Sequence, residues 1–109
     1  MLEIKGKEYE LKFPVNTLCI MAEDNIDVMN IESMSINLKT IRDLFHYGLK
    51  HENKKITKNQ AGDLMDDYLE EGGNVYDLFM EIMNALAKSL GKGKADKEDN
   101  NEAEEEEGK

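Results

Sequence analysis

The chain is poor in the residues that would point to a disulfide-stabilised or membrane-bound protein. It has no tryptophan, one proline and one cysteine. The lone Cys19 cannot form an intramolecular disulfide, and its apolar neighbours predict a small buried side chain in a reducing cytoplasm. No apolar run approaches the length of a membrane span, and the N-terminus lacks the apolar stretch of a signal peptide. With 109 residues, the sequence predicts one cytoplasmic domain with a modest core.

Positive charge is also scarce. The chain carries 14 Lys and Arg residues against 24 Asp and Glu residues, for a formal net charge of −10. A surface of this sign is repelled by nucleic acid and by anionic membranes. We therefore exclude binding to nucleic acid or to a membrane as a leading function.

Motifs that carry chemistry are missing. His46 and His51 are five residues apart, which does not match the spacing of zinc ligands on one helix face, and we expect both imidazoles to face solvent. The acidic residues between 63 and 77 do not match a calcium-binding loop and are expected to form the wet face of a helix. Gly91–Lys94 follows a helix and lacks the spacing of a phosphate-binding loop. The sequence thus predicts no catalytic, cofactor or metal site, and a binding protein that is not an enzyme.

The N-terminal segment alternates apolar and charged residues on both sides of Gly6-Lys7. This period of two predicts a β-hairpin with its turn at that dipeptide. A two-stranded sheet is marginal alone, so one face must pack on helices. The inward residues are expected to be Leu2, Ile4, Tyr9, Leu11 and Phe13.

Two helices are expected in the first half of the chain after Pro14. Asn16 is the predicted N-cap of a helix through Ala22, which Asp24-Asn25 ends. Residues 26–34 are compatible with a turn or a short helix. Ser35 is expected to open a helix over residues 36–50.

Helical periodicity divides the residues of this second helix between two faces. One side carries Leu38, Ile41, Leu44, Phe45, Gly48 and Leu49, and the other carries Lys39, Arg42, Asp43, His46 and Lys50. Tyr47 falls on the polar side, where it is either an exposed contact residue or covered by the hairpin.

Two better-marked helices follow a polar loop at residues 51–55. Thr57 and Gln60 have the spacing of a capping box, and Gly72-Gly73 provides a left-handed stop. The apolar stripe between them consists of Ala61, Leu64, Met65, Tyr68 and Leu69. Asn74 is the predicted cap of the last helix, from Val75 to about Leu90.

The apolar surface of the last helix is unusually broad. It covers an arc of roughly 200°, whereas a surface helix needs roughly 100° to face a core. Extra core contacts and a partner surface are both compatible with this width. The candidate partner-binding residues lie on its second flank, and they are Tyr76, Met80, Met83 and Ala87.

The composition changes at Gly91. Residues 91–109 contain alanine as their only apolar residue type and include four consecutive glutamates, so we expect a disordered acidic tail. The folded domain is predicted at residues 1–90. We expect an α+β fold in which the N-terminal β-hairpin packs on a small bundle of three to four helices.

The order of these motifs resembles a known family. The hairpin is followed by Asn16-Thr17-Leu18, by LFHYGL at Leu44–Leu49, by Lys50-His51-Glu52 and by LMDDYLEEGG at Leu64–Gly73. This order is similar to that of the tail assembly chaperones of long, non-contractile-tailed phages and prophages of Gram-positive hosts. The similarity extends over about residues 2–90, and its motifs are structural.

The resemblance implies a non-enzymatic chaperone in the host cytoplasm that is absent from the mature virion. Such proteins bind the tape-measure protein and help tail-tube subunits polymerise around it. The family often makes a longer product by programmed frameshifting, which adds a domain that recruits the tail-tube protein, and Gly91–Lys94 is the expected site of the frame change. An acidic regulatory module, of the antitoxin or anti-repressor type, is the alternative that the residues leave open.

Overall fold

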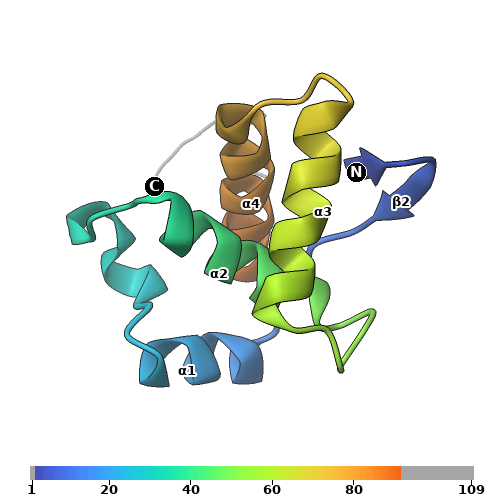
Figure 1. The fold of residues 1–109 in the computed structure, drawn as a ribbon. Helices are drawn as coiled ribbons and strands as arrows, with labels where there is room; N and C mark the ends of the chain where they lie inside the picture. Colours follow the sequence, from blue (N-terminus) through green and yellow to red (C-terminus); the bar gives the residue numbers. More distant parts are fainter. Residues whose placement is uncertain (1, 92–109) are drawn as a thin grey trace.

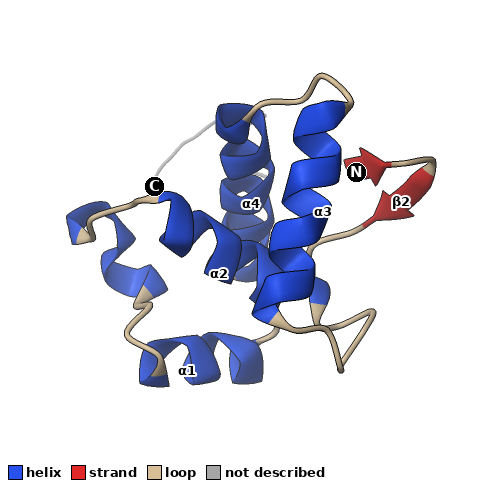
Figure 2. Ribbon diagram, in the orientation of Figure 1, coloured by secondary structure: helices blue, strands red, loops and turns tan. Residues whose placement is uncertain are grey.

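The computed structural model describes residues 2–91 and has the predicted α+β fold (Figures 1 and 2). A hairpin is followed by four α-helices and one short 3-10 helix, η1. The predicted tail at residues 92–109 lies outside the described part of the chain. The elements are β1 (Leu2–Ile4), β2 (Lys7–Tyr9), α1 (Val15–Glu23), η1 (Val28–Ser33), α2 (Leu38–Leu49), α3 (Lys58–Glu70) and α4 (Val75–Ser89).

The hairpin is confirmed, but its turn lies one residue earlier than predicted. Leu2 pairs with Tyr9 and Ile4 pairs with Lys7, which leaves Lys5-Gly6 as the turn. Both turn residues have positive φ, 52° and 79°, as a two-residue turn between twisted antiparallel strands requires. The Lys5 N–H donates to the Glu71 carboxylate at 2.6 Å, which ties the turn to the end of α3.

The second strand is shorter than the alternation suggested. It ends at Tyr9, and residues 10–14 continue towards the centre of the molecule, where the Lys12 N–H donates to the Gly48 carbonyl of α2 at 3.1 Å. The Phe13 ring packs against Gly48 so closely that a Cβ there would lie 2.8 Å from its Cζ. This close packing explains a glycine in the middle of α2.

The core forms around α2, which packs against both α3 and α4, while β1 packs against α3. In Figure 1 the hairpin lies at one edge of the molecule, and α1 and η1 lie at the opposite edge. The largest fully buried side chains, which form the centre of the core, are Ile4, Phe13, Met21, Leu44, Phe45, Leu49, Leu78 and Ile82.

The predicted N-caps of α3 and α4 are confirmed, whereas those of α1 and α2 are wrong. The Thr57–Gln60 capping box is present, and Asn74 accepts from the Asp77 N–H. Asn16 instead lies inside α1, which begins after Pro14 without a side-chain cap. The cap of α2 is Asn37, which accepts from the Thr40 N–H, so Ser35 is outside the helix.

The two expected faces of α2 are only partly correct. Leu38, expected inside, is 60% exposed, whereas Asp43, His46 and Tyr47, expected on the polar side, are buried. The reason is that α2 is covered on both sides, which helical periodicity alone does not indicate. Cys19 is also exposed, because Met21 supplies the buried contact of α1.

The ambiguous segment at residues 26–34 contains η1. Asn25, with a φ of 67°, ends the α1 region, and Ile26 is buried. The Asp27 side chain then accepts from the Met29 N–H and caps η1.

Candidate functional site

The four candidate partner-binding residues lie along one face of α4, as their spacing predicted. We call Tyr76, Met80, Met83 and Ala87 the α4 stripe. Tyr76 is 82% exposed and Met80 is 56% exposed, whereas Met83 and Ala87 are half-buried. The buried face of the same helix is formed by Leu78, Ile82 and Leu86. The arc therefore combines a core face with an apolar flank whose N-terminal half is open to solvent.

The C-terminal half of the α4 stripe borders a groove of about 360 Å³. Residues 28–33 of η1 form one wall, and Met83, Leu86, Ala87 and Leu90 form the other. Met29, on the η1 side, is 81% exposed. The open half of the stripe therefore leads into a groove with an apolar α4 wall and a mixed η1 wall that includes Asn30, Glu32 and Ser33, and we call it the η1 groove.

The η1 wall is the part of this surface that the sequence did not reveal. Residues 26–34 were compatible with either a turn or a helix, so no position could be assigned to Met29. The one available signal was the apolar content of residues 26–34, in which Val28, Met29 and Ile31 lie close together and no Lys or Arg occurs.

A cluster of charged and polar side chains surrounds Asp43 of α2. The buried Asp43 carboxylate accepts from Lys39 Nζ at 2.8 Å and from Arg42 Nη2 at 3.1 Å, and Lys58 Nζ is 3.8 Å away. Burial alone would raise the pKa of Asp43, but these hydrogen bonds and the charge of Lys58 outweigh it and lower the pKa below 3.8.

Tyr47 belongs to the same cluster, and it lies neither at the surface nor beneath the hairpin. Its hydroxyl donates to Asp24 Oδ2 at 2.7 Å, and Lys58 Nζ donates to the same oxygen at 2.9 Å. Burial, followed by this hydrogen bond, raises the pKa of Tyr47 to about 12. These bonds join the end of α1 to α2 and α3, so the cluster has a structural role.

The two histidines also differ from the expectation. His46 is 7% exposed, and its Nε2 lies 2.9 Å from the Ile56 carbonyl, so Nε2 carries the proton. Burial lowers the pKa of His46 below 6.5. His51 is half-buried and bonds to the Glu10 carbonyl. Within residues 2–91, no three His, Cys, Asp or Glu side chains are placed to hold a metal ion.

The acidic residues of α3 occupy its solvent face as predicted, with Asp63, Asp66 and Glu70 exposed. Over the described residues, no helix is both long enough and apolar enough to cross a membrane. The surface features that the described residues provide are therefore an apolar stripe, grooves and the acidic face of α3.

Residues 1–106 match the family described as "Domain of unknown function (DUF5055)". The match covers nearly the whole chain, so the protein belongs to this family. No curated protein and no solved structure shows significant similarity to the chain.

Proposed function

We propose that this DUF5055 member is a phage tail assembly chaperone that binds the tape-measure protein and promotes polymerisation of the tail tube around it. The proposed action is non-enzymatic and takes place in the host cytoplasm, and the protein does not remain in the virion. The resemblance of residues 2–90 to such chaperones supports the role. The geometry of α4 suggests how binding would occur.

The observation that carries the proposal is the exposed half of the α4 stripe. Tyr76 and Met80 lie next to each other on the helix, one turn apart, and both present most of their side chain to solvent. A tyrosine offers a large rigid contact, and methionine adapts to apolar partners of varied shape. This combination suits a chaperone that must cover several apolar segments of one client.

A helical client segment fits this surface. An amphipathic helix recognised in a groove contacts its partner with residues spaced three and four apart. The α4 stripe has the same spacing, and the η1 groove extends it past Met83 and Ala87. Because the chain carries a net charge of −10, clients with basic residues beside their apolar face would be attracted, and acidic ones would be repelled.

A longer translation product is compatible with this arrangement. The described structure ends at Gly91, immediately after α4. A frame change at Gly91–Lys94 would preserve the hairpin and all the helices, and it would replace only the following residues. Both products would then bind the tape-measure protein, and the longer product would add the domain that recruits the tail-tube protein.

The test is affinity capture of the tagged 109-residue chain from cells in which the phage or prophage is replicating, with the captured proteins identified by mass spectrometry. The tape-measure protein is expected as the main partner, and it should be lost with the Met80→Glu variant. Capture of a toxin or a repressor in its place would support the regulatory alternative. A nucleotide sequence without a slippery run at codons 91–94 would remove the longer product only.

A further inference from the structure

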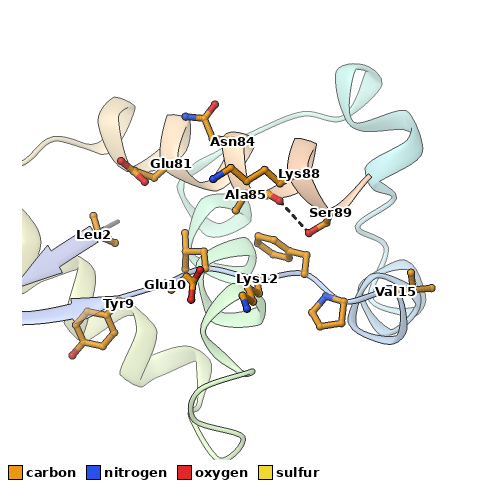
Figure 3. A pocket seen from close by; sticks show the side chains of 13 residues that line it. Leu2, Tyr9, Glu10, Lys12, Val15, Glu81, Asn84, Ala85, Lys88 and Ser89 are labelled. Carbon is orange, nitrogen blue, oxygen red and sulfur yellow. Dashed lines mark hydrogen bonds between the residues drawn. The ribbon is translucent and has the colours of Figure 1, made fainter. Parts of the chain in front are cut away.

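A second groove lies away from the α4 stripe, between α4 and the segment that joins β2 to α1 (Figure 3). Its volume is about 550 Å³. Residues 9–15 form one wall, the α4 side chains Glu81, Asn84, Ala85, Lys88 and Ser89 form the other, and Leu2 lies at one end. Neither the α4 stripe nor the polar cluster uses this groove.

The joining segment is extended, and its two edges differ. Leu11 and Phe13 turn their side chains towards Gly48, while Glu10 and Lys12 are exposed, which is the alternation of a β-strand. The edge that faces α2 is hydrogen-bonded, since Lys12 N–H donates to Gly48 O at 3.1 Å and Glu10 O bonds to His51. In an extended chain, the backbone groups of Leu11 and Phe13 point to the opposite edge.

That opposite edge is the one on which β1 lies. Tyr9, two residues before Leu11, pairs with Leu2, so the Leu11 and Phe13 edge continues the line of β1 beyond Leu2. Among residues 2–91, no backbone group hydrogen-bonds to the N–H or carbonyl of Leu11 or Phe13. In Figure 3 the groove occupies this line, with α4 on its far side.

The lining of the groove favours a particular kind of occupant. Leu2, Leu11, Phe13 and Ala85 give it an apolar interior, and the small Ala85 lets another backbone approach α4. The rim carries Glu10 and Lys12 on one wall and Glu81 and Lys88 on the other, so it presents both signs of charge. Recognition here would thus depend on backbone hydrogen bonds and apolar side chains and not on the charge of the occupant.

We propose that this groove accepts an extended segment of a partner polypeptide, which adds to the sheet in line with β1 and antiparallel to residues 10–14. The segment has apolar side chains at alternate positions, which fill the groove, and its backbone pairs with Leu11 and Phe13. Pro14 has no N–H and marks the end of the pairing edge.

Hydrogen exchange of the backbone amides in the free 109-residue chain, followed by NMR, tests the edge itself. Lys12, whose N–H is bonded to Gly48, is expected to exchange slowly, and Leu11 and Phe13 are expected to exchange much faster. Equal protection of Leu11 and Lys12 in the free chain would show that the edge is already paired, and it would overturn the proposal.

Binding is tested with a library of short random peptides displayed on beads and sorted on the intact chain. Selected peptides should have apolar residues at alternate positions and should slow the exchange of the Leu11 and Phe13 amides. Leu11→Pro should weaken them about tenfold relative to Leu11→Ala, because both variants lose the leucine side chain but only proline removes the N–H. If both variants bind the selected peptides equally, the edge is not the site.

A second substitution keeps the test decisive if Leu11→Pro does not fold. Ala85→Phe fills the groove from the α4 wall without touching the backbone edge, and it should abolish binding of the selected peptides. Met80→Glu, on the α4 stripe, should leave their binding unchanged, which separates this site from the tape-measure site. A library that yields no peptide sensitive to Ala85→Phe overturns the proposal, whatever the outcome for the tape-measure protein.

Discussion

Replacing the buried Asp43 with asparagine tests whether the polar cluster around α2 stabilises the fold. The substitution keeps the size of the side chain and one acceptor oxygen, but it removes a charge that accepts hydrogen bonds from Lys39 and Arg42. Hydrogen bonds to charged groups contribute about 1.5–3 kcal/mol each when well shielded. Lys39 is 72% exposed and Arg42 is 31% exposed, so solvent screens both partners substantially.

We therefore expect Asp43→Asn to lower the free energy of unfolding by about 1–2 kcal/mol at pH 7. For a domain of this size, the loss corresponds to a drop in Tm of about 5–15 °C. Chemical denaturation followed by circular dichroism measures the first quantity, and thermal melts measure the second. Asp66→Asn, at an exposed position of α3, is the matched control and should change stability by less than about 0.5 kcal/mol.

The pH dependence gives an independent check. The folded pKa of Asp43 is lowered, so its contribution to stability is present above about pH 4 and is lost as the pH falls through the folded pKa. The difference in stability between Asp43→Asn and the natural chain should therefore shrink below pH 4. A variant as stable as the Asp66→Asn control at pH 7 would refute the argument that these ion pairs stabilise Asp43.

Three further predictions concern α2 and α3. Gly48→Ala should destabilise the fold by about 1–3 kcal/mol, because the new Cβ would lie 2.8 Å from the Phe13 ring, whereas Gly62→Ala, with only ordinary contacts, should stabilise α3 by up to about 1 kcal/mol in the same denaturation assay. The raised pKa of Tyr47, about 12, means that its contribution is present below pH 10 and is lost as the pH rises towards 12, so Tyr47→Phe should flatten alkaline unfolding. The lowered pKa of His46 means that its contribution is present above pH 6.5 and is lost as the pH falls below that value, so His46→Gln should reduce the decline in Tm between pH 6.5 and 5.

Features of the fold that depend on neighbouring residues in the sequence could be predicted well. The Thr57–Gln60 capping box and the Asn74 cap each need only a side chain and a backbone N–H three residues apart. The hairpin followed from simple alternation. Its turn was misplaced by one residue, because a glycine is compatible with either central position of a two-residue turn, and only the pairing of Ile4 with Lys7 fixes it at the second.

Features that depend on distant residues could not be predicted. The buried Tyr47 donates its hydroxyl to Asp24, 23 residues before it, and Lys58, 11 residues after it, donates to the same carboxylate oxygen. The buried His46 imidazole hydrogen-bonds to the Ile56 carbonyl in the loop that follows α2. A helical wheel of α2 alone predicts one solvent-exposed face. The structure instead packs α2 against both α3 and α4.

The sequence placed the four residues of the α4 stripe on one helix face, but it did not indicate what surrounds them. Helical spacing was enough to place the α4 stripe on one face, because α4 is regular over its full length. Helical spacing could not indicate that η1 lies beside Met83 and Ala87. It also could not indicate that Tyr76 and Met80 remain exposed to solvent.

The most direct test of the proposed function is the affinity of the chain for overlapping peptides that span the tape-measure protein of the same genome, measured by fluorescence anisotropy. Met80→Glu should weaken binding at least tenfold while circular dichroism remains that of the folded chain, because Met80 is 56% exposed. Asn59→Glu, which adds the same charge at an exposed position of α3, should bind normally. Ile82→Glu should unfold the domain, since Ile82 is fully buried. A folded Met80→Glu variant with unchanged affinity, or a natural chain that binds none of the peptides, would contradict a tape-measure chaperone that acts through the α4 stripe.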